Sequence, residues 1–488
     1  MTATEIRRLK EDELTQVENF LADKPEAVTL RLERARLLME LGQRDEAKTA
    51  YLEALAKDPM NASAMNNLGT LLLTMGFRTA ARTAYEAAVR YARNPMAHMN
   101  LANLLIEDRE LEAAREHYET ALRLTAADHA KAHQGLATVL LNLGETEAAA
   151  RHREQGFRNY AVIAQPYCGK NDPIRVIVLI SAMGGNVPTH SFLDDRFFQI
   201  TMIVSEYFDL AEPLPDHDMV FNAVGDVEIC SEALAAATRI AAKSSAPIIN
   251  PPAAVIPTSR AANAQRLQGI PGLIAPKIVT LPRGEVTAEN LTRQGFVFPL
   301  LMRRPGFHGG EHFVQVDSAD QLGLHLDSLP GDDITVIQYI DVRSADGKWR
   351  KYRAMMIDDE IFPLHAAVSR NWKIHYFSAD MRDNADHRQE DADFLNDMPK
   401  VLGPRAMAAL KQIQTTLELD YAGIDFGLTP DGDVVLFETN ATMVVNPPDP
   451  DELWDYRRPP VKRILDAVRR IFLKRLRARP GKGHAQSA

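Results

Sequence analysis

A repeat with a period of about 34 residues is the feature that most constrains how this 488-residue chain folds. Tyr51 and Tyr85 lie 34 residues apart, and Tyr118 follows 33 residues later. Small residues recur at fixed distances around the three tyrosines, in the sets Ala47 and Ala54, Ala81 and Ala88, and Ala114 and Ala121, and Gly42 and Gly76 share the spacing. Self-similarity at this period predicts helix pairs that stack into a solenoid, with small residues where the helices cross.

The repeat resembles the tetratricopeptide repeat over about residues 28–158. A fourth unit is degenerate and carries Gly144, Ala149, Arg153 and Gly156, so we expect about three and a half repeats, closed by a cap at 149–160. Arrays of this kind present a concave groove to a partner. Asn66, His98, Met99 and His133 fall near groove-facing positions, although each is more simply an ordinary half-buried helix residue. The array is expected to recruit a peptide or protein, or to form a homodimer.

Composition narrows the class of protein. Only two cysteines occur, Cys168 and Cys230, so no disulfide framework is expected. No apolar run approaches the ~20 residues of a membrane span, and a cytoplasmic location is predicted. The net charge is −10, but the segment from Arg457 onward is strongly basic. Such a tail suits an anionic membrane or the acidic body of the same chain, and no nucleic-acid partner is expected.

The pattern changes near Tyr167, where the alanine-rich helices stop and short apolar runs begin. We expect strands at 175–181, 218–224 and 247–250, with a helix at 229–244. The chain is therefore predicted to be multidomain: an all-α solenoid over 1–160, a small α/β subdomain over 174–257, an α+β region over 258–456, and a basic amphipathic helix and tail over 457–488.

A β-hairpin is predicted at 423–445, with a Thr-Pro-Asp-Gly turn at 429–432 and a return strand at 434–437. Folding at that turn brings Asp425 close to Glu438 and Asn440, and the latter two share one face of their strand. Two carboxylates and an amide oxygen suit a hard cation such as Mg²⁺. The simpler interpretation is a polar hairpin end with solvated acids.

Three further segments have the character of an anion or nucleotide site. A strand at 296–302 leads to Arg303 and a glycine-containing loop, where backbone N–H groups and a guanidinium suit phosphate oxygens. A strand beginning at 334 runs into Gln338-Tyr-Ile-Asp341, which could seat an adenine edge. A strand at 349–357 places Lys351 and Arg353 on one face.

Taken in order over about residues 174–470, these elements resemble the ATP-grasp superfamily, in particular the glutathione synthetases, D-alanine–D-alanine ligases and ribosomal-protein glutamate ligases. The resemblance implies that Asp425, Glu438 and Asn440 hold Mg²⁺ against the phosphates of ATP. Arg303 and Arg260 stand where the family usually has lysines on the phosphates. It further implies a phosphate-covering loop of Gly306, His308, Gly309 and Gly310, an adenosine seat of Gln338, Tyr339, Ile340 and Asp341, and a place for Arg353 beside the acyl phosphate or the acceptor carboxylate.

The function implied is an ATP- and Mg²⁺-dependent carboxylate–amine ligase that forms an amide through an acyl phosphate, with the repeats recruiting a peptide or protein substrate. The alternatives are a scaffold that binds nucleotide without catalysis and a kinase that phosphorylates a hydroxyl. Retention of all three metal ligands argues against the scaffold, whereas the two arginines depart from the family pattern.

Other segments carry weaker signals. His365, Ser369, Lys373 and His375 either bind substrate or belong to a surface strand and loop. Residues 380–397 are rich in acids and are expected to form a solvated insertion or a substrate lid. Residues 461–477 form an amphipathic helix that is expected to dock on the acidic body, with membrane-surface binding as the alternative. Disorder is expected from Pro480 onward.

Overall fold

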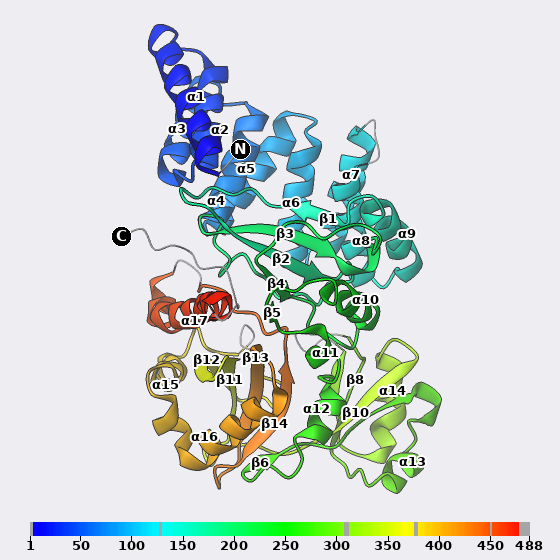
Figure 1. The fold of residues 1–488 in the computed structure, drawn as a ribbon. Helices are drawn as coiled ribbons and strands as arrows, with labels where there is room; N and C mark the ends of the chain where they lie inside the picture. Colours follow the sequence, from blue (N-terminus) through cyan, green and yellow to red (C-terminus); the bar gives the residue numbers. More distant parts are fainter. Residues whose placement is uncertain (1–2, 126–128, 307–311, 375–378, 449–450, 478–488) are drawn as a thin grey trace. The chain divides into compact units, whose positions relative to one another are not determined.

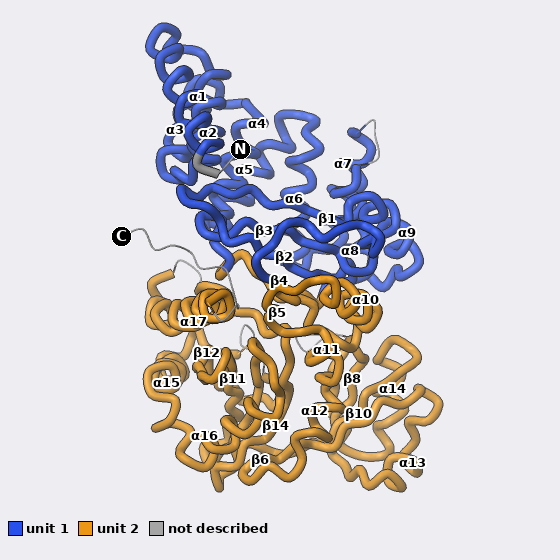
Figure 2. Tube along the Cα trace, viewed as in Figure 1, with its two compact units in different colours: residues 1–184, 193–220 blue, residues 185–192, 221–488 orange. Residues whose placement is uncertain are grey.

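The computed structural model describes residues 3–125, 129–306, 312–374, 379–448 and 451–477 (Figure 1). The chain divides into two compact units (Figure 2). Unit 1 comprises residues 1–184 and 193–220, and unit 2 comprises 185–192 and 221–488, so the backbone crosses between them three times. The segment from Pro480 onward lies outside the described residues.

The N-terminal part of unit 1 is a stack of helix pairs, as the repeat predicts. Helix α1 (Ala3–Asp23), which the sequence did not predict, precedes the pairs. The pairs are α2 (Val28–Glu40) with α3 (Arg44–Lys57), α4 (Ala62–Thr74) with α5 (Arg78–Tyr91), α6 (Pro95–Glu107) with α7 (Leu111–Leu124), and α8 (Ala130–Asn142) with α9 (Thr146–Phe157). Within the described residues the fourth unit is thus a complete pair rather than the half repeat expected, because the degenerate unit still keeps Ala149 and Gly156 buried in α9.

The repeated tyrosines fill the space between helices. Tyr85 and Tyr118 are each 1% exposed. A side chain added at Gly69 would lie 2.7 Å from the Tyr85 ring, and one added at Gly135 would lie 2.1 Å from the Tyr118 ring. The Tyr85 hydroxyl also hydrogen bonds the Thr70 hydroxyl at 3.1 Å. Small residues are therefore required at these crossings, which explains the spacing seen in the sequence.

Unit 1 continues into a small sheet in which β3 lies between β1 and β2. The strands are β1 (Val162–Ala164), β2 (Ile174–Ile180) and β3 (Phe198–Val204), followed by the 3-10 turn Ser205–Tyr207. β3 pairs antiparallel with β1 and parallel with β2. The continuous apolar run predicted at 175–181 is β2, and its central residues are buried. Strand β4 (Met219–Asn222) carries the chain from unit 1 into unit 2.

Unit 2 begins with short elements and a four-stranded antiparallel sheet. The short elements are α10 (Ser231–Ala241), β5 (Ile248–Ile249), α11 (Pro252–Val255) and α12 (Arg260–Arg266). The sheet has the order β7 (Ile278–Pro282), β10 (Asp333–Gln338), β8 (Leu300–Arg303), β9 (Phe313–Val316), with α13 (Ala288–Arg293), α14 (Leu322–Ser328) and the 3-10 turns Arg283–Glu285 and Ala319–Gln321 between strands. The strand predicted at 296–302 begins only at Leu300, because Pro299 has no N–H to give the ladder.

The second sheet of unit 2 contains the predicted hairpin. Its order is β12 (Glu360–Ser369), β11 (Trp349–Ile357), β13 (Tyr421–Leu428), β14 (Val434–Asn440), β6 (Leu273–Ile274), antiparallel except for β6 against β14. At the turn, the Thr429 N–H donates to the Asp433 carbonyl at 2.9 Å, and Gly432 has φ +80°, which glycine adopts without strain. The hairpin is confirmed, and its return strand runs on to Asn440, beyond the predicted end at 437.

Helices α15 (Ala385–Asn396) and α16 (Met398–Leu417) follow β12 in sequence. The expectation of a solvated insertion at 380–397 is wrong, because α15 buries Phe394, Leu395 and Asp391 and packs against β12. The Asp391 carboxylate accepts hydrogen bonds from the Ala366 N–H and the Tyr456 hydroxyl, each at 2.7 Å. The count of acidic residues concealed two apolar side chains that lie on one buried side of the helix.

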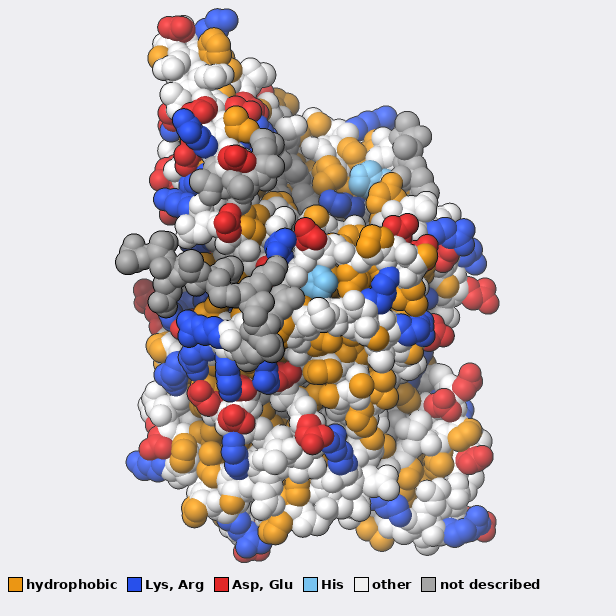
Figure 3. Space-filling view, in the orientation of Figure 1, with side chains coloured by type: hydrophobic (Ala, Val, Ile, Leu, Met, Phe, Trp, Pro, Cys, Tyr) orange, Lys and Arg blue, Asp and Glu red, His pale blue; other side chains and the backbone are white. Residues whose placement is uncertain are grey.

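The C-terminal helix α17 (Arg458–Arg477), preceded by the 3-10 turn Glu452–Arg457, docks on unit 2 as expected. It buries Ile464, Val468 and Phe472, and it packs against β11 and β12. Basic side chains gather over α17 beside acidic ones (Figure 3), among them Lys474 paired with Asp358. Within the described ranges, no helix is long and apolar enough to cross a membrane.

Candidate functional site

A cavity of about 480 Å³ in unit 2 takes its lining from both sheets and from α12. Most of the predicted site residues line it: Arg260, Arg303, Gln338, Tyr339, Ile340, Arg353, Asp425, Glu438 and Asn440. Gly306 and Asp341 are not part of the lining, and His308, Gly309 and Gly310 lie outside the described residues. The structure therefore brings together residues that are spread over 181 positions, from 260 to 440, in one hollow.

The hairpin places its three polar side chains together. Asp425 stands opposite Glu438 in the β13–β14 register, and Asn440 stands opposite Gly423. The Asn440 amide donates to Glu438 Oε1 at 2.7 Å, while its Oδ1 accepts from the Thr442 N–H at 3.0 Å. Among the described residues no group of three or more His, Cys, Asp and Glu could hold a metal ion, so a metal here would need the Asn440 amide oxygen as a ligand.

Asp425 is held by two cations from β11. Arg353 Nε lies 2.5 Å from Oδ1, Arg353 Nη2 lies 2.8 Å from Oδ2, and Lys351 Nζ lies 2.6 Å from Oδ2. Burial acts to raise the pKa of Asp425, which is 1% exposed, but Arg353 and Lys351 outweigh it and keep that pKa well below its usual range. Alternation along β11 puts Lys351 and Arg353 on one face, as predicted.

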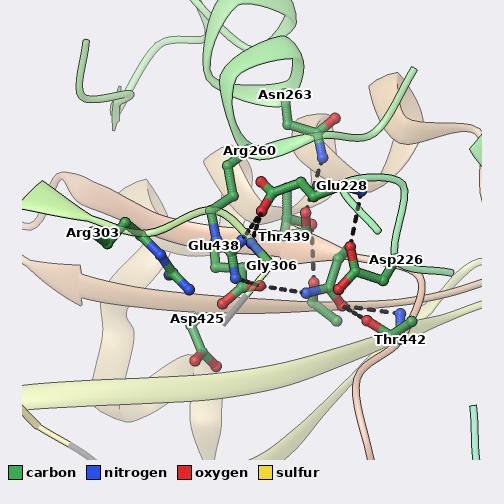
Figure 4. Close-up of polar contacts among 12 residues, drawn as sticks. Asp226, Glu228, Arg260, Asn263, Arg303, Gly306, Asp425, Glu438, Thr439 and Thr442 are labelled. Carbon is green, nitrogen blue, oxygen red and sulfur yellow. Dashed lines mark hydrogen bonds and ion pairs between the residues drawn. The ribbon is translucent and has the colours of Figure 1, made fainter. Parts of the chain in front are cut away.

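Glu438 is held in turn by Arg260, whose side chain is 8% exposed (Figure 4). Arg260 Nη2 lies 2.6 Å from Glu438 Oε1, and Nη1 lies 2.7 Å from Glu228 Oε2. The same Glu228 oxygen accepts the Gly306 N–H at 3.3 Å. Glu228 was not predicted as a site residue. The only sequence signal for it is the Asp-Val-Glu run at 226–228, shortly after a predicted strand.

Helix α12 is fixed so that Arg260 points into the site. The Ser259 hydroxyl caps its start by accepting the Ala262 N–H at 3.2 Å. The Asn263 amide then donates to the Thr439 carbonyl at 2.9 Å, which ties the helix to β14 (Figure 4). The position of the guanidinium is thereby set by the backbone of the hairpin itself.

Arg303 extends from the end of β8 into the same space as Arg260, Glu438 and Asp425 (Figure 4). Its guanidinium lies 5.8 Å from the centre of the Phe313 ring. Burial, and then the positive charge of Arg260, lower the pKa of Arg303 to about 10, so the group remains protonated at neutral pH. A buried cation close to a second cation favours an anionic ligand.

The predicted adenosine seat is only partly assembled. The Gln338 N–H donates to the Lys277 carbonyl at 2.9 Å, and its side-chain oxygen accepts the Lys277 N–H at 3.2 Å. Asp341 turns away from the cavity and accepts from the Arg343 N–H at 2.9 Å and from Arg343 Nη2 at 2.8 Å. The short Asp-x-Arg spacing makes this local turn available, and it outcompetes the predicted ribose contact.

Aromatic side chains complete the lining, and the sequence gave no hint of their convergence. Trp349, Trp372 and Phe313 all line the cavity, and the Phe313 and Trp372 rings meet edge to face with centroids 5.3 Å apart. Lys373 also lines it and donates to the Phe313 carbonyl at 3.2 Å.

Three of the weaker sequence signals do not reach the cavity. His365 is buried under the sheet, where burial and then Arg353 hold its pKa well below its usual range. Ser369 is buried and accepts the Asn371 N–H at 3.1 Å. Neither lines the cavity. His375 lies outside the described residues.

Comparisons with known proteins identify the helical part of the chain. Residues 32–74, 67–129 and 101–152 match the family profile described as Tetratricopeptide repeat. Tetratricopeptide repeats commonly bind peptide or protein partners, which points to protein–protein interaction for this part of the chain. No curated protein matches the chain.

Solved structures similar to the chain cover its helical part. MamA 41-end from Desulfovibrio magneticus RS-1 is 22% identical, with 30% of this chain and 84% of that one covered and a TM-score of 0.27. Pseudomonas aeruginosa PilF is 20% identical, with 31% and 70% covered and a TM-score of 0.29. YrrB, described as a tetratricopeptide-repeat protein with an unusual peptide-binding site, is 19% identical, with 30% and 74% covered and a TM-score of 0.27.

Proposed function

We propose that this chain is an ATP- and Mg²⁺-dependent carboxylate–amine ligase of the ATP-grasp type, whose helical repeats recruit a peptide or protein. The observation that carries the proposal is the meeting of Asp425, Glu438 and Asn440 with Arg303 and Arg353 around one cavity. Oxygen ligands and guanidinium groups in one hollow match a magnesium–triphosphate ligand, which presents both cation and anion.

The donor set fits Mg²⁺ by chemistry, since two carboxylates and an amide offer hard oxygen ligands. Both carboxylates are now engaged by cations, Asp425 by Arg353 and Lys351, and Glu438 by Arg260. A triphosphate entering the cavity would draw these cations to its oxygens and release the carboxylates. Mg²⁺, when bound there, would neutralise charge on the phosphates.

In the proposed reaction, an oxygen of the substrate carboxylate attacks the γ-phosphorus of ATP, which forms an acyl phosphate and releases ADP. An amine then attacks the acyl carbon, and an amide and inorganic phosphate result, with the amine proton lost to solvent. Arg303 and Arg353 would stabilise negative charge that develops during the two steps. The aromatic side chains Trp349 and Trp372 would exclude water from the acyl phosphate.

A second candidate is a scaffold that binds nucleotide without turnover. The observation that favours it is the complete ion pairing of both carboxylates in the same cavity. Arginine in place of lysine at Arg260 and Arg303 points the same way. A kinase that phosphorylates a hydroxyl is the third outcome of the test below.

The test is incubation of the full chain with ATP, Mg²⁺ and a cell-extract pool of acids and amines, with products read by mass spectrometry and ADP release measured in parallel. The ligase predicts an amide product, and ADP release that requires both a carboxylate and an amine. Added hydroxylamine should trap the acyl phosphate as a hydroxamate. A stable phosphorylated product would indicate the kinase, and ATP binding without turnover would indicate the scaffold.

The metal ligands are tested by Glu438→Ala, with Glu232→Ala on the exposed side of α10 as the matched control. Glu438→Ala should abolish Mg²⁺-dependent turnover, while Glu232→Ala should leave it unchanged. Turnover that survives Glu438→Ala would show that the metal assignment is wrong.

A further inference from the structure

Two histidine pairs bridge the helices of the third and fourth repeats in unit 1. His98 on α6 and His117 on α7 place their Nδ1 atoms 2.8 Å apart. His133 on α8 and His152 on α9 repeat the arrangement at 2.7 Å. The ring centroids are 5.1 Å and 5.0 Å apart in the two pairs. The two pairs are thus the same construction built twice, in adjacent repeats.

The repeat itself does not require histidine at these places. Each histidine on a first helix stands three residues after the start of that helix, where α2 has Arg31 and α4 has Met65. Each histidine on a second helix stands six residues after the start, where α3 has Ala50 and α5 has Ala84. The helix packing of the first two repeats therefore forms without an imidazole pair.

The protonation state suits metal binding. Burial lowers the pKa of His98, His117 and His152, so these imidazoles are neutral at pH 7. Two neutral rings that meet through Nδ1 share one proton between two lone pairs. Two imidazole nitrogens bound to one ion at ~2.0–2.1 Å stand ~3 Å apart, so each pair would need to open by only a few tenths of an ångström.

The surroundings leave the third-repeat pair open to solvent. His98 lines a groove of about 580 Å³, together with Thr120 and Arg123. The field is mixed: Glu86 and Glu116 act on His117 in favour of a cation, whereas Arg123 acts on His98 against one. At the fourth repeat, Glu119 and Arg151 oppose each other in the same way around His152.

We propose that each histidine pair is a two-imidazole site for a borderline transition-metal ion of the Cu²⁺, Ni²⁺ and Zn²⁺ class. Each ion would displace the shared proton and take two Nδ1 ligands, with water in the other positions. Imidazole suits these ions, and Cu²⁺ should bind most tightly of the three. A site of this kind would cross-link the two helices of a repeat, and it does not depend on any activity of unit 2.

The experiment is titration of the metal-free full chain with Cu²⁺, read by isothermal calorimetry and by the nitrogen hyperfine splitting in electron paramagnetic resonance. The expected result is uptake of two ions per chain, each with imidazole nitrogen coupling. His117→Ala and His152→Ala should each remove one ion, and the double variant should remove both. Alanine at these positions is compatible with folding, because α3 and α5 carry Ala50 and Ala84 there.

His325→Ala on α14 of unit 2 is the matched control, and it should leave the uptake at two ions. Helical circular dichroism of each variant should equal that of the parent, which separates loss of a ligand from loss of the fold. Absence of uptake, or uptake unchanged in the double variant, would overturn the proposal. A single ion lost in either single variant would overturn the two-site arrangement in favour of one site shared by the repeats.

Discussion

Arg353 and Asp425 stand opposite each other in the β11–β13 register, and their side chains form a two-point ion pair with contacts of 2.5 Å and 2.8 Å. The arginine side chain is 24% exposed and the aspartate 1%. The planar guanidinium matches both carboxylate oxygens, which a lysine could not do. One cross-strand pair therefore fixes a carboxylate that would otherwise be a buried, unpaired charge.

Removing this partner should destabilise unit 2. Arg353→Met is expected to lower the free energy of unfolding by about 3 kcal/mol, since Lys351 alone would be left to neutralise Asp425. Urea denaturation followed by tryptophan fluorescence measures the change. Arg350→Met on the opposite face of β11 is the control, because its partners Asp346 and Glu390 are about 40% exposed and need no buried counter-charge. An equal loss in the two variants would contradict the expectation.

The buried carboxylate of Asp391 should hold α15 on the sheet. Asp391→Ala leaves the Ala366 N–H and the Tyr456 hydroxyl without this acceptor, and we expect a loss of about 3 kcal/mol. Asp393→Ala, on the exposed side of the same helix, should change stability by less than about 0.5 kcal/mol. Hydrogen exchange of the α15 amides should rise in Asp391→Ala alone. Protection that stays at the parental level would rule out this role.

Unit 1 should lose stability as the pH falls. Burial depresses the pKa of His98, His117 and His152 in the folded state, so the unfolded chain binds protons first. Stability is therefore full above the ordinary histidine pKa of 6.5 and declines as the pH drops through the lower folded values. Urea midpoints from circular dichroism at pH 7.5 and pH 5.5 test this. The double variant His117→Ala/His152→Ala should show a smaller difference between the two midpoints.

Packing at the helix crossings should tolerate no added methyl group. A Cβ at position 135 would lie 2.1 Å from the Tyr118 ring, so Gly135→Ala should cost about 1–3 kcal/mol. Thr138→Ala on the exposed side of the same helix is the control, with an expected change below about 0.5 kcal/mol. Tyr118→Leu combined with Gly135→Ala should restore part of the loss, because the smaller side chain leaves room. Additive effects of the two changes would argue against this contact.

The features that sequence predicted well are those with strong local signals. The helix pairs follow from tyrosines and alanines at a fixed period, and the hairpin follows from a turn whose Gly432 takes a positive φ. Alternation on β11 was enough to place Lys351 and Arg353 on one face.

The features that sequence missed depend on contacts between distant segments. The pairing of Arg260 with Glu228 joins residues 32 positions apart, and its pairing with Glu438 joins residues 178 positions apart. Neither leaves a pattern in the neighbouring sequence. Asp341 failed for the opposite reason, because a local turn with Arg343 competes with the distant contact. Charge counts also misjudged 380–397, where two buried apolar residues decide the structure.

The threefold crossing of the backbone between the units has a practical meaning for dissecting the protein. No single cut separates the units, because residues 193–220 of unit 1 follow residues 185–192 of unit 2. A fragment that ends at 184 would lack β3, the strand that lies between β1 and β2, and would expose the edges of both. A soluble repeat fragment should therefore either stop before β1 or continue through β3, and limited proteolysis should yield fragments that stay associated after cleavage.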